Sequence, residues 1–167
     1  DVNGDGLSDI YFTANLVASR LYFNKGNMQF QEVTQPAGVV NRQGWKTGVT
    51  MADVNGDGWL DIYVCRSGPL SEVERANELF INQGQGKFKE MAAEYGLDDS
   101  GYGSHASFFD YDKDGDLDMY LLNHAVEPEF NLGIAGTKAQ RHPEYGDKLY
   151  RNDNGKFVDV SAAAGIK

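Results

Sequence analysis

The chain has 167 residues, of which 41% are hydrophobic and 12% aromatic, and it carries 25 acidic against 15 basic residues. This composition is typical of a globular chain, and the formal net charge of -10 argues against a nucleic-acid partner, whose phosphates need a basic surface. No apolar run approaches the roughly 20 residues that cross a bilayer, so we expect no transmembrane segment. The single cysteine, Cys65, excludes an internal disulfide and is predicted to be a small buried strand residue.

Taken in chain order, the sequence repeats itself. The motif DVNGDGLSDIYF begins at Asp1, and close copies follow as DVNGDGWLDIYV from Asp53 and DYDKDGDLDMYL from Asp110. Each copy precedes a second shared block: SRLYFNKGNMQFQEVTQPAGV, NELFINQGQGKFKEMAAEYGL and DKLYRNDNGKFVDVSAAAGI. A third block, GWKTGVTMAD or GYGSHASFFD, precedes only the second and third copies. Linked motifs that recur in one order define a structural repeat. We therefore treat residues 1–167 as a single domain with repeat units 1–43, 44–100 and 101–167.

A complete unit is predicted to contain four short strands joined by turns. In the second and third units the expected strands are 45–53 and 103–110, 61–65 and 118–122, 78–82 and 148–152, and 86–91 and 155–160. The second strand is apolar on consecutive residues, from Ile62 to Cys65, which indicates a sheet covered on both faces. The segments EMAAEYGL and DVSAAAGI are interpreted as strand ends that run into a turn.

Four-stranded sheets stacked around an axis cover one another's faces, and the sequence therefore predicts an all-β fold. The predicted architecture is a β-propeller segment of about three four-stranded blades, the first of which lacks its first strand. Because propellers use about four to eight blades, we expect this segment to be part of a larger propeller. Further blades of the same chain or other subunits of a complex would complete the ring. An open stack with exposed sheet edges is the remaining alternative.

Carboxylates and amides recur at positions 1, 3, 5 and 9 of each acidic loop, a spacing that lets them converge on one hard cation. Glycine at position 6 permits the backbone reversal, and the residue at position 7 would offer its main-chain carbonyl. All-oxygen ligation favours Ca²⁺, so we predict up to three structural calcium ions. The predicted metal ligands are Asp1, Asn3, Asp5, Leu7 and Asp9; Asp53, Asn55, Asp57, Trp59 and Asp61; and Asp110, Asp112, Asp114, Asp116 and Asp118.

Two other interpretations apply to loops of this composition. An EF-hand needs Glu at position 12 and a following helix, whereas position 12 here is Phe12, Val64 or Leu121 and a strand is expected to follow. Solvated Asp-Gly hairpins without a metal are the second interpretation. Three copies of the loop in register argue against it.

The pattern Asp-x-Asx-x-Asp-Gly-x-x-Asp, followed by LYRNDNGKFVDVSAAAGI, resembles the FG-GAP/VCBS repeats of integrin α-subunit-like propellers. Within that family it is most similar to the ASPIC/UnbV branch, which includes the secreted cartilage acidic protein and bacterial relatives. The resemblance covers essentially the whole chain and implies an extracellular, cell-surface or periplasmic β-propeller. It also implies that calcium ions brace the hairpins between the first and second strands of each blade. Asn3 and Asn55 are amides at a position where the family also commonly has Asp.

On this basis we expect a calcium-stiffened scaffold that binds a protein or a glycan. In a blade of this order the connections between the second and third strands lie on the face opposite the calcium hairpins. The longest of them, residues 124–147, is the predicted recognition loop.

The alternative is a polysaccharide lyase or glycosidase built on a propeller. Its candidate acids, bases or charge stabilisers are His124, Glu127, Glu129, His142 and Tyr145. No catalytic motif supports this alternative, and we predict that the chain is not an enzyme. Trp45 and Trp59 could stack on a sugar ring, but packing between blades is the favoured interpretation for Trp45, and Trp59 is expected to lie exposed in the metal loop.

Overall fold

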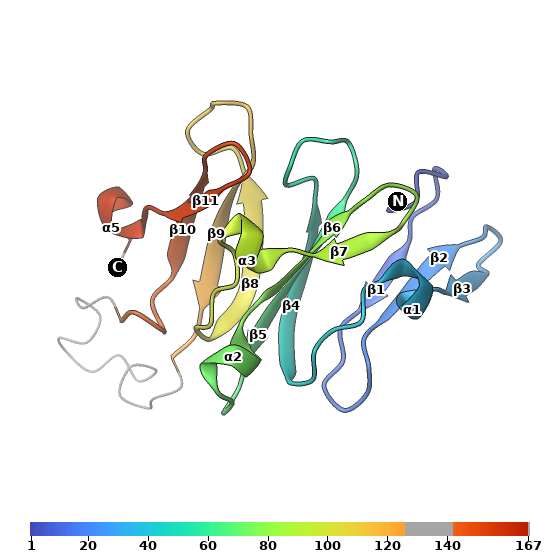
Figure 1. Cartoon of the computed structure of the whole chain (residues 1–167), viewed down its shortest axis with the longest axis horizontal. Coiled ribbons are helices and arrows are strands. Elements are labelled where there is room, and N and C mark those ends of the chain that lie inside the picture. Colours follow the sequence, from blue (N-terminus) through green and yellow to red (C-terminus); the bar gives the residue numbers. More distant parts are fainter. Residues whose placement is uncertain (126–141, 167) are drawn as a thin grey trace.

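The computed structural model of the chain describes residues 1–125 and 142–166. Its strands form three antiparallel sheets that stand side by side (Figure 1). The first sheet has the order β1-β2-β3, the second β4-β5-β6-β7 and the third β8-β9-β10-β11. The strands are β1 (Ile10–Phe12), β2 (Arg20–Asn24), β3 (Phe30–Glu32), β4 (Trp45–Ala52), β5 (Asp61–Ser67), β6 (Glu78–Asn82), β7 (Phe88–Glu90), β8 (Gly103–Phe109), β9 (Asp118–Asn123), β10 (Lys148–Asn152) and β11 (Phe157–Asp159). The predicted all-β propeller segment is confirmed, with three strands in the first sheet and four in each of the others. The boundaries of the repeat units remain predictions.

The middle sheet is covered on both faces, as its sequence predicted. All seven residues of β5 are buried, and alternate residues belong to different cores. Tyr63 and Cys65 pack in a core shared with the third sheet, whereas Ile62 and Val64 pack in a core shared with the first. Cys65 is therefore a buried strand residue, and burial raises the pKa of its thiol to about 12.

Strands β4 and β8, each the first of its sheet, approach each other closely. The Thr47 hydroxyl donates to the Gly103 carbonyl and the Thr50 hydroxyl to the Ala106 carbonyl, both at 2.6 Å. A Cβ atom at Gly48 would lie 2.4 Å from the Ser104 carbonyl oxygen. Glycine is required at this position because any side chain would separate the two strands.

Each sheet is followed by a short helix, and here the sequence interpretation of strand ends running into a turn was wrong. The helices are α1 (Thr34–Ala37), α3 (Ala92–Tyr95) and α5 (Ser161–Ala164). The carboxylate of Glu90, the last residue of β7, accepts a hydrogen bond from the Ala92 amide at 2.9 Å. Gly96 ends α3 in the left-handed conformation, with φ of 78°. A carboxylate at the start and a glycine at the end therefore favour one helical turn over continued strand.

A fourth helix, α2 (Glu72–Arg75), lies in the connection between β5 and β6 and was not predicted. Ser71 and Glu74 form a capping box at its start. None of the helices in the described part of the chain is long and apolar enough to cross a membrane.

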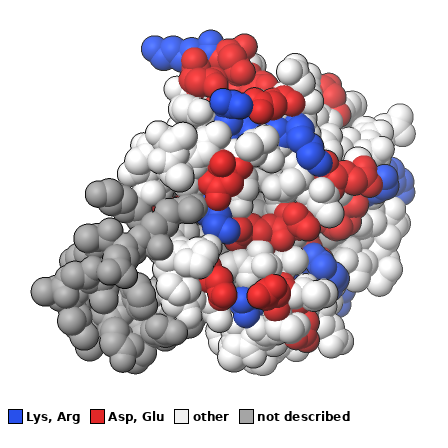
Figure 2. Space-filling view, turned by 60° about the vertical axis from the view of Figure 1, so that its left-hand side comes forward, with Lys and Arg blue, Asp and Glu red and all other residues white. Residues whose placement is uncertain are grey.

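The connections between strands gather at two ends of the molecule. The acidic loops between β4 and β5 and between β8 and β9 lie at the same end as the N-terminus, at the top of Figure 1. The β1–β2 connection and α2 lie at the bottom. We call these the acidic end and the opposite end. On the face that Figure 2 shows, acidic and basic side chains are interspersed, without a continuous basic surface.

Candidate metal centres

The carboxylate at position 1 closes each acidic loop by accepting backbone amides. Asp1 Oδ2 accepts from the Gly6 amide at 2.8 Å, and Asp53 Oδ2 accepts from the Gly58 amide at 2.8 Å. Asp110 Oδ2 accepts from the equivalent glycine amide, that of Gly115, at 3.2 Å. The three repeats thus fold this part of the loop in the same way.

The carboxylate at position 9 joins the loop to the third strand of its sheet. In the second loop Asp61 Oδ2 accepts from the Val54 amide at 3.0 Å, and Oδ1 accepts from the Asn82 amide at 2.8 Å. Asp9 and Asp118 make the same two hydrogen bonds. Each accepts from the backbone amide at position 2 of its loop and from the amide of the last residue of the corresponding strand, which is β2 for Asp9 and β10 for Asp118. Asp61 is fully buried, and burial raises the pKa of this carboxyl to about 6 although both amide hydrogen bonds lower it.

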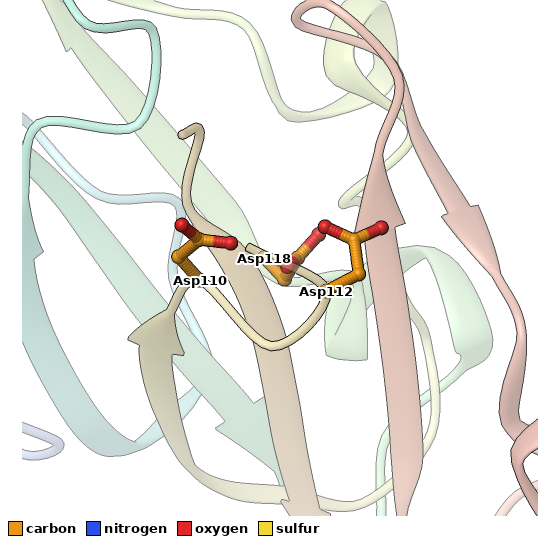
Figure 3. A group of neighbouring side chains, drawn as sticks. All are labelled: Asp110, Asp112 and Asp118. Atoms are coloured by element: carbon orange, nitrogen blue, oxygen red, sulfur yellow. The ribbon is translucent and has the colours of Figure 1, made fainter. Parts of the chain in front are cut away.

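The third loop brings three carboxylates together. Oxygen atoms of Asp110, Asp112 and Asp118 all lie within 4.8 Å of one another, and Figure 3 shows Asp118 between the other two. Their donor set consists only of hard oxygens, which suits Ca²⁺. Desolvation, followed by the charges of Asp114 and Asp118, raises the pKa of Asp112. A divalent cation would relieve this repulsion.

The first two loops have an amide at position 3, so their equivalent groups contain two carboxylates and one amide. Asn3 Oδ1 accepts from the Asp5 amide at 2.9 Å, and Asn55 Oδ1 accepts from the Asp57 amide at 3.1 Å. Within residues 1–125 and 142–166, three carboxylates meet in this way only in the third loop. The reason is the difference at position 3, where the third loop has Asp112 in place of the amides Asn3 and Asn55.

Positions 5 and 7 complete the predicted ligand set. The carboxylate at position 5 accepts a hydrogen bond from the backbone amide at position 7 in every loop. Asp5 accepts from Leu7 at 2.9 Å, Asp57 from Trp59 at 2.9 Å and Asp114 from Asp116 at 3.1 Å. Asp116 Oδ1 is buried without a hydrogen-bond partner in the described structure. Desolvation and the neighbouring Asp114 charge raise the pKa of the Asp116 carboxyl. The role of the position 7 carbonyls as ligands stays a prediction.

An asparagine at the end of the third strand was missed as a structural residue. The Asn82 side-chain amide donates to the Leu60 carbonyl of its own sheet at 3.1 Å and to the Val2 carbonyl of the first loop at 2.8 Å. Asn152 likewise donates to the Leu117 carbonyl at 3.1 Å and to the Val54 carbonyl at 3.4 Å. These side chains join neighbouring acidic loops. The signal was in the sequence, because RLYFN, ELFIN and KLYRN all end in Asn.

The predicted recognition loop is described in part, because residues 126–141 lie outside the described residues, as do Glu127 and Glu129. The described candidates lie in an aromatic group at the opposite end. His142 stacks on Tyr145 with ring centroids 4.0 Å apart, and Tyr102 contacts Tyr145 and His124 edge to face. The His124 ring also contacts the Ser104 hydroxyl at 2.9 Å.

The two tryptophans differ from their sequence interpretation. Trp45 is 54% exposed, so the expectation that it packs between blades was wrong: at the start of β4 its ring lies beyond the core. Trp59, expected to be exposed, is partly buried, and a Cβ atom at Gly4 would lie 2.7 Å from its ring. Trp59 therefore packs on the neighbouring acidic loop.

Comparison with known proteins assigns the repeat. A family model described as FG-GAP-like repeat matches residues 1–64 and 70–121, which is more than half of the chain and includes all three acidic loops. No match was found among curated proteins. The repeated loops, the antiparallel sheets and the family model agree, and the chain belongs to the FG-GAP-like repeat family.

Proposed function

We propose that the chain is a calcium-stabilised β-propeller segment that acts as an interaction scaffold for a protein or a glycan. FG-GAP-like repeats suggest a scaffold of this kind, and the family is generally non-enzymatic. The proposal includes an extracellular, cell-surface or periplasmic location and membership of the ASPIC/UnbV branch. The observation that carries it is the contrast between three equivalent loops at the acidic end and dissimilar connections at the opposite end.

Calcium is proposed because all three loops hold their carboxylate oxygens with the same backbone hydrogen bonds. The position 1 and position 9 carboxylates are fixed by backbone amides in every repeat. Asp112 adds a third carboxylate in the third loop. Extracellular calcium modules work with dissociation constants on the order of 0.1 to 1 mM, which fits the proposed location. Bound ions would stiffen the end at which neighbouring sheets meet.

The partner is proposed to bind at the opposite end, where the aromatic group lies. Tyr145 and His142 are partly buried, and His124 is exposed. The Arg75 guanidinium lies over the Tyr102 ring, 4.3 Å from its centroid. Aromatic and arginine side chains held together in this way are typical of interaction surfaces.

The test is binding to immobilised proteins and glycans in calcium, with the Tyr145→Ala variant and a matched Tyr111→Ala control. Tyr111 is an exposed tyrosine of the third acidic loop. We expect saturable binding that Tyr145→Ala weakens about tenfold or more and Tyr111→Ala leaves unchanged. Equal weakening by both variants would contradict the proposed surface. Turnover of an acidic polysaccharide that His142→Ala abolishes would instead support the enzyme.

A further inference from the structure

A cavity of about 600 Å³ lies at the opposite end, between the first and second sheets. Its walls come from three parts of the chain: Asn15 to Ala18 of the β1–β2 connection; Asn41, Gln43 and Gly44 before β4 together with Trp45 and Lys46 at its start; and Pro69 and Leu70 before α2. The volume falls in the range of about 300 to 1,000 Å³ that small-ligand sites occupy. None of these residues belongs to the acidic loops or to the aromatic group.

The walls are largely apolar and open to solvent. Leu16 is fully exposed, Val17 is 69% exposed and the Trp45 ring is half exposed. Gly44, with φ of 132°, allows Leu70 to close one side, because a Cβ atom there would lie 3.2 Å from the Leu70 side chain. The apolar surface is therefore shaped into a pocket and is not merely a row of exposed side chains.

The cation of this pocket, Lys46, has a largely buried side chain. Lys46 is only 7% exposed, and its backbone amide donates to Asn15 Oδ1 at 2.7 Å. Within residues 1–125 and 142–166, its ammonium has no hydrogen bond or ion pair. Desolvation and then the neighbouring Arg66 charge lower the pKa of Lys46 below its ordinary value, although the Glu78 charge opposes this shift. An anion in the cavity would give this partly desolvated ammonium a partner.

The other charges nearby are already matched. Arg66, which is opposite Lys46 in the β4–β5 register, donates to Glu78 at 2.9 Å and to the carbonyls of Arg42, Gln43 and Glu74. Arg42 also donates to Glu78, at 3.2 Å. Glu74, whose carboxylate interacts with the Arg66 charge, is bound to Ser71. Two carboxylates, Glu74 and Glu78, thus face Arg42, Arg66 and Lys46, so this group carries one positive charge in excess.

We propose that this cavity binds a carboxylate carried on an apolar body, with the carboxylate on Lys46 and the body against Trp45 and Leu70. A phosphate would need several donors, whereas Lys46 is the cation of these walls whose side chain makes no hydrogen bond within the described ranges 1–125 and 142–166. A neutral sugar would leave the charge of Lys46 uncompensated, and Asn15 and Asn41 in the walls already hydrogen-bond within the protein. This proposal specifies the chemical class of one ligand that binds at the opposite end. It therefore rests on the proposed function of this end as a binding surface.

The carboxylate can come from a free acid or from the C-terminus of a polypeptide, and the test separates them. The Trp59→Phe variant leaves Trp45 as the only tryptophan, so its fluorescence reports binding. In calcium-containing buffer this variant is titrated with N-acetylphenylalanine and N-acetylphenylalaninamide. A short peptide ending in phenylalanine is used in the same way, with a free and with an amidated C-terminus.

We expect at least one free acid to bind about tenfold or more tightly than its amide. Lys46→Met, measured in the same background, is expected to remove this preference, and Lys46→Arg to keep it. Lys89→Met, at an exposed lysine, is the matched control and should change nothing. Melting curves show whether each variant is folded.

Equal binding of acid and amide, or no saturable binding of any of the four probes, would overturn the inference. Preference retained in Lys46→Met would do the same. Binding of only the peptide acid would support the site and identify a polypeptide C-terminus as its ligand. Failure of these titrations would leave the protein and glycan measurement with Tyr145→Ala unaffected, so the two proposals fail separately.

Discussion

The acidic end and the opposite end of this propeller segment are built by different rules. At the acidic end, three loops use the same hydrogen bonds between carboxylates and backbone amides. At the opposite end, each sheet has its own contacts. Glu78 of the second sheet is bound by Arg42 and Arg66, whereas at the same strand position of the third sheet Lys148 is paired with Asp99. The charge at that position is reversed from one sheet to the next.

The difference shows where the fold is fixed and where it is free to vary. Loops that hold neighbouring sheets together must keep one geometry, because Asn82 and Asn152 connect each loop to the one before it. At the opposite end the pairs Arg42–Glu78 and Asp99–Lys148 each connect the third strand of a sheet to the segment that precedes that sheet, and either order of charges serves, so the residues there can differ between repeats. We therefore expect the binding surface at the opposite end, where the sequences of the repeats differ.

The largest effect should come from removing the metal that the acidic end is proposed to hold. At a calcium concentration about 100 times the dissociation constant, each filled site stabilises the folded state by about 2.7 kcal/mol. Excess chelator should therefore lower the melting temperature by several degrees or more, as measured by circular dichroism. A melting curve that does not change in chelator would contradict the proposed calcium sites.

Asp112→Asn sharpens this test, because it gives the third loop the amide found at position 3 of the first two. We expect calorimetry to show weaker calcium binding at one site and unchanged binding at the others. Asp153→Asn, at an exposed carboxylate paired with Arg151, is the control.

The next largest effect is predicted for Glu78→Gln at the opposite end. Arg66 and Glu78 are both almost completely buried, so the substitution leaves a buried guanidinium charge without its counterion. Loss of one partner of such a pair costs about 3 to 5 kcal/mol. Urea unfolding measures this cost, and Glu94→Gln, in an exposed pair with Lys89, should cost almost nothing. Similar values for the two variants would mean that the buried network contributes little.

A smaller effect is expected for Asn82→Ala, which breaks the link between neighbouring acidic loops. The change leaves the buried Val2 carbonyl and the partly buried Leu60 carbonyl without this donor and should cost about 1 to 3 kcal/mol. Asn24→Ala is the matched control, because in the part of the chain that the structure describes the Asn24 side-chain amide donates only to the Ser8 carbonyl of its own loop. Chemical denaturation of both variants should show the larger loss for Asn82, and the reverse order would refute the linking role.

The smallest effect is predicted for Arg151→Ala, which removes a contact that only the third repeat has. Arg151 binds Asp153 through two hydrogen bonds of 2.7 and 2.9 Å, but both side chains are exposed. Exposed pairs contribute about 0 to 1 kcal/mol. Thermal melts should thus barely distinguish the variant from the parent protein, and a loss comparable to that of Asn82→Ala would contradict this ranking.

Much of the fold followed from pattern alone. The third strands, 78–82 and 148–152, have the bounds that the sequence predicted. Each is a short run with hydrophobic residues that has turn residues on both sides. The consecutive apolar residues of β5 predicted a sheet buried on both faces, and the two cores confirm it. The helices were missed because the capping carboxylate and the closing glycine act over four residues, which is too short for a hydrophobic period to show.

The sequence by itself determined the repeat, the all-β architecture and the grouping of oxygen donors in each acidic loop, since all of these depend on residues close together in the chain. Only the tertiary structure decided that Asn82 spans two sheets and that the largely buried Lys46 side chain lines an apolar cavity. Both depend on segments that are distant in the sequence. Stacking of the sheets sets which of their groups face one another, and no local pattern encodes that.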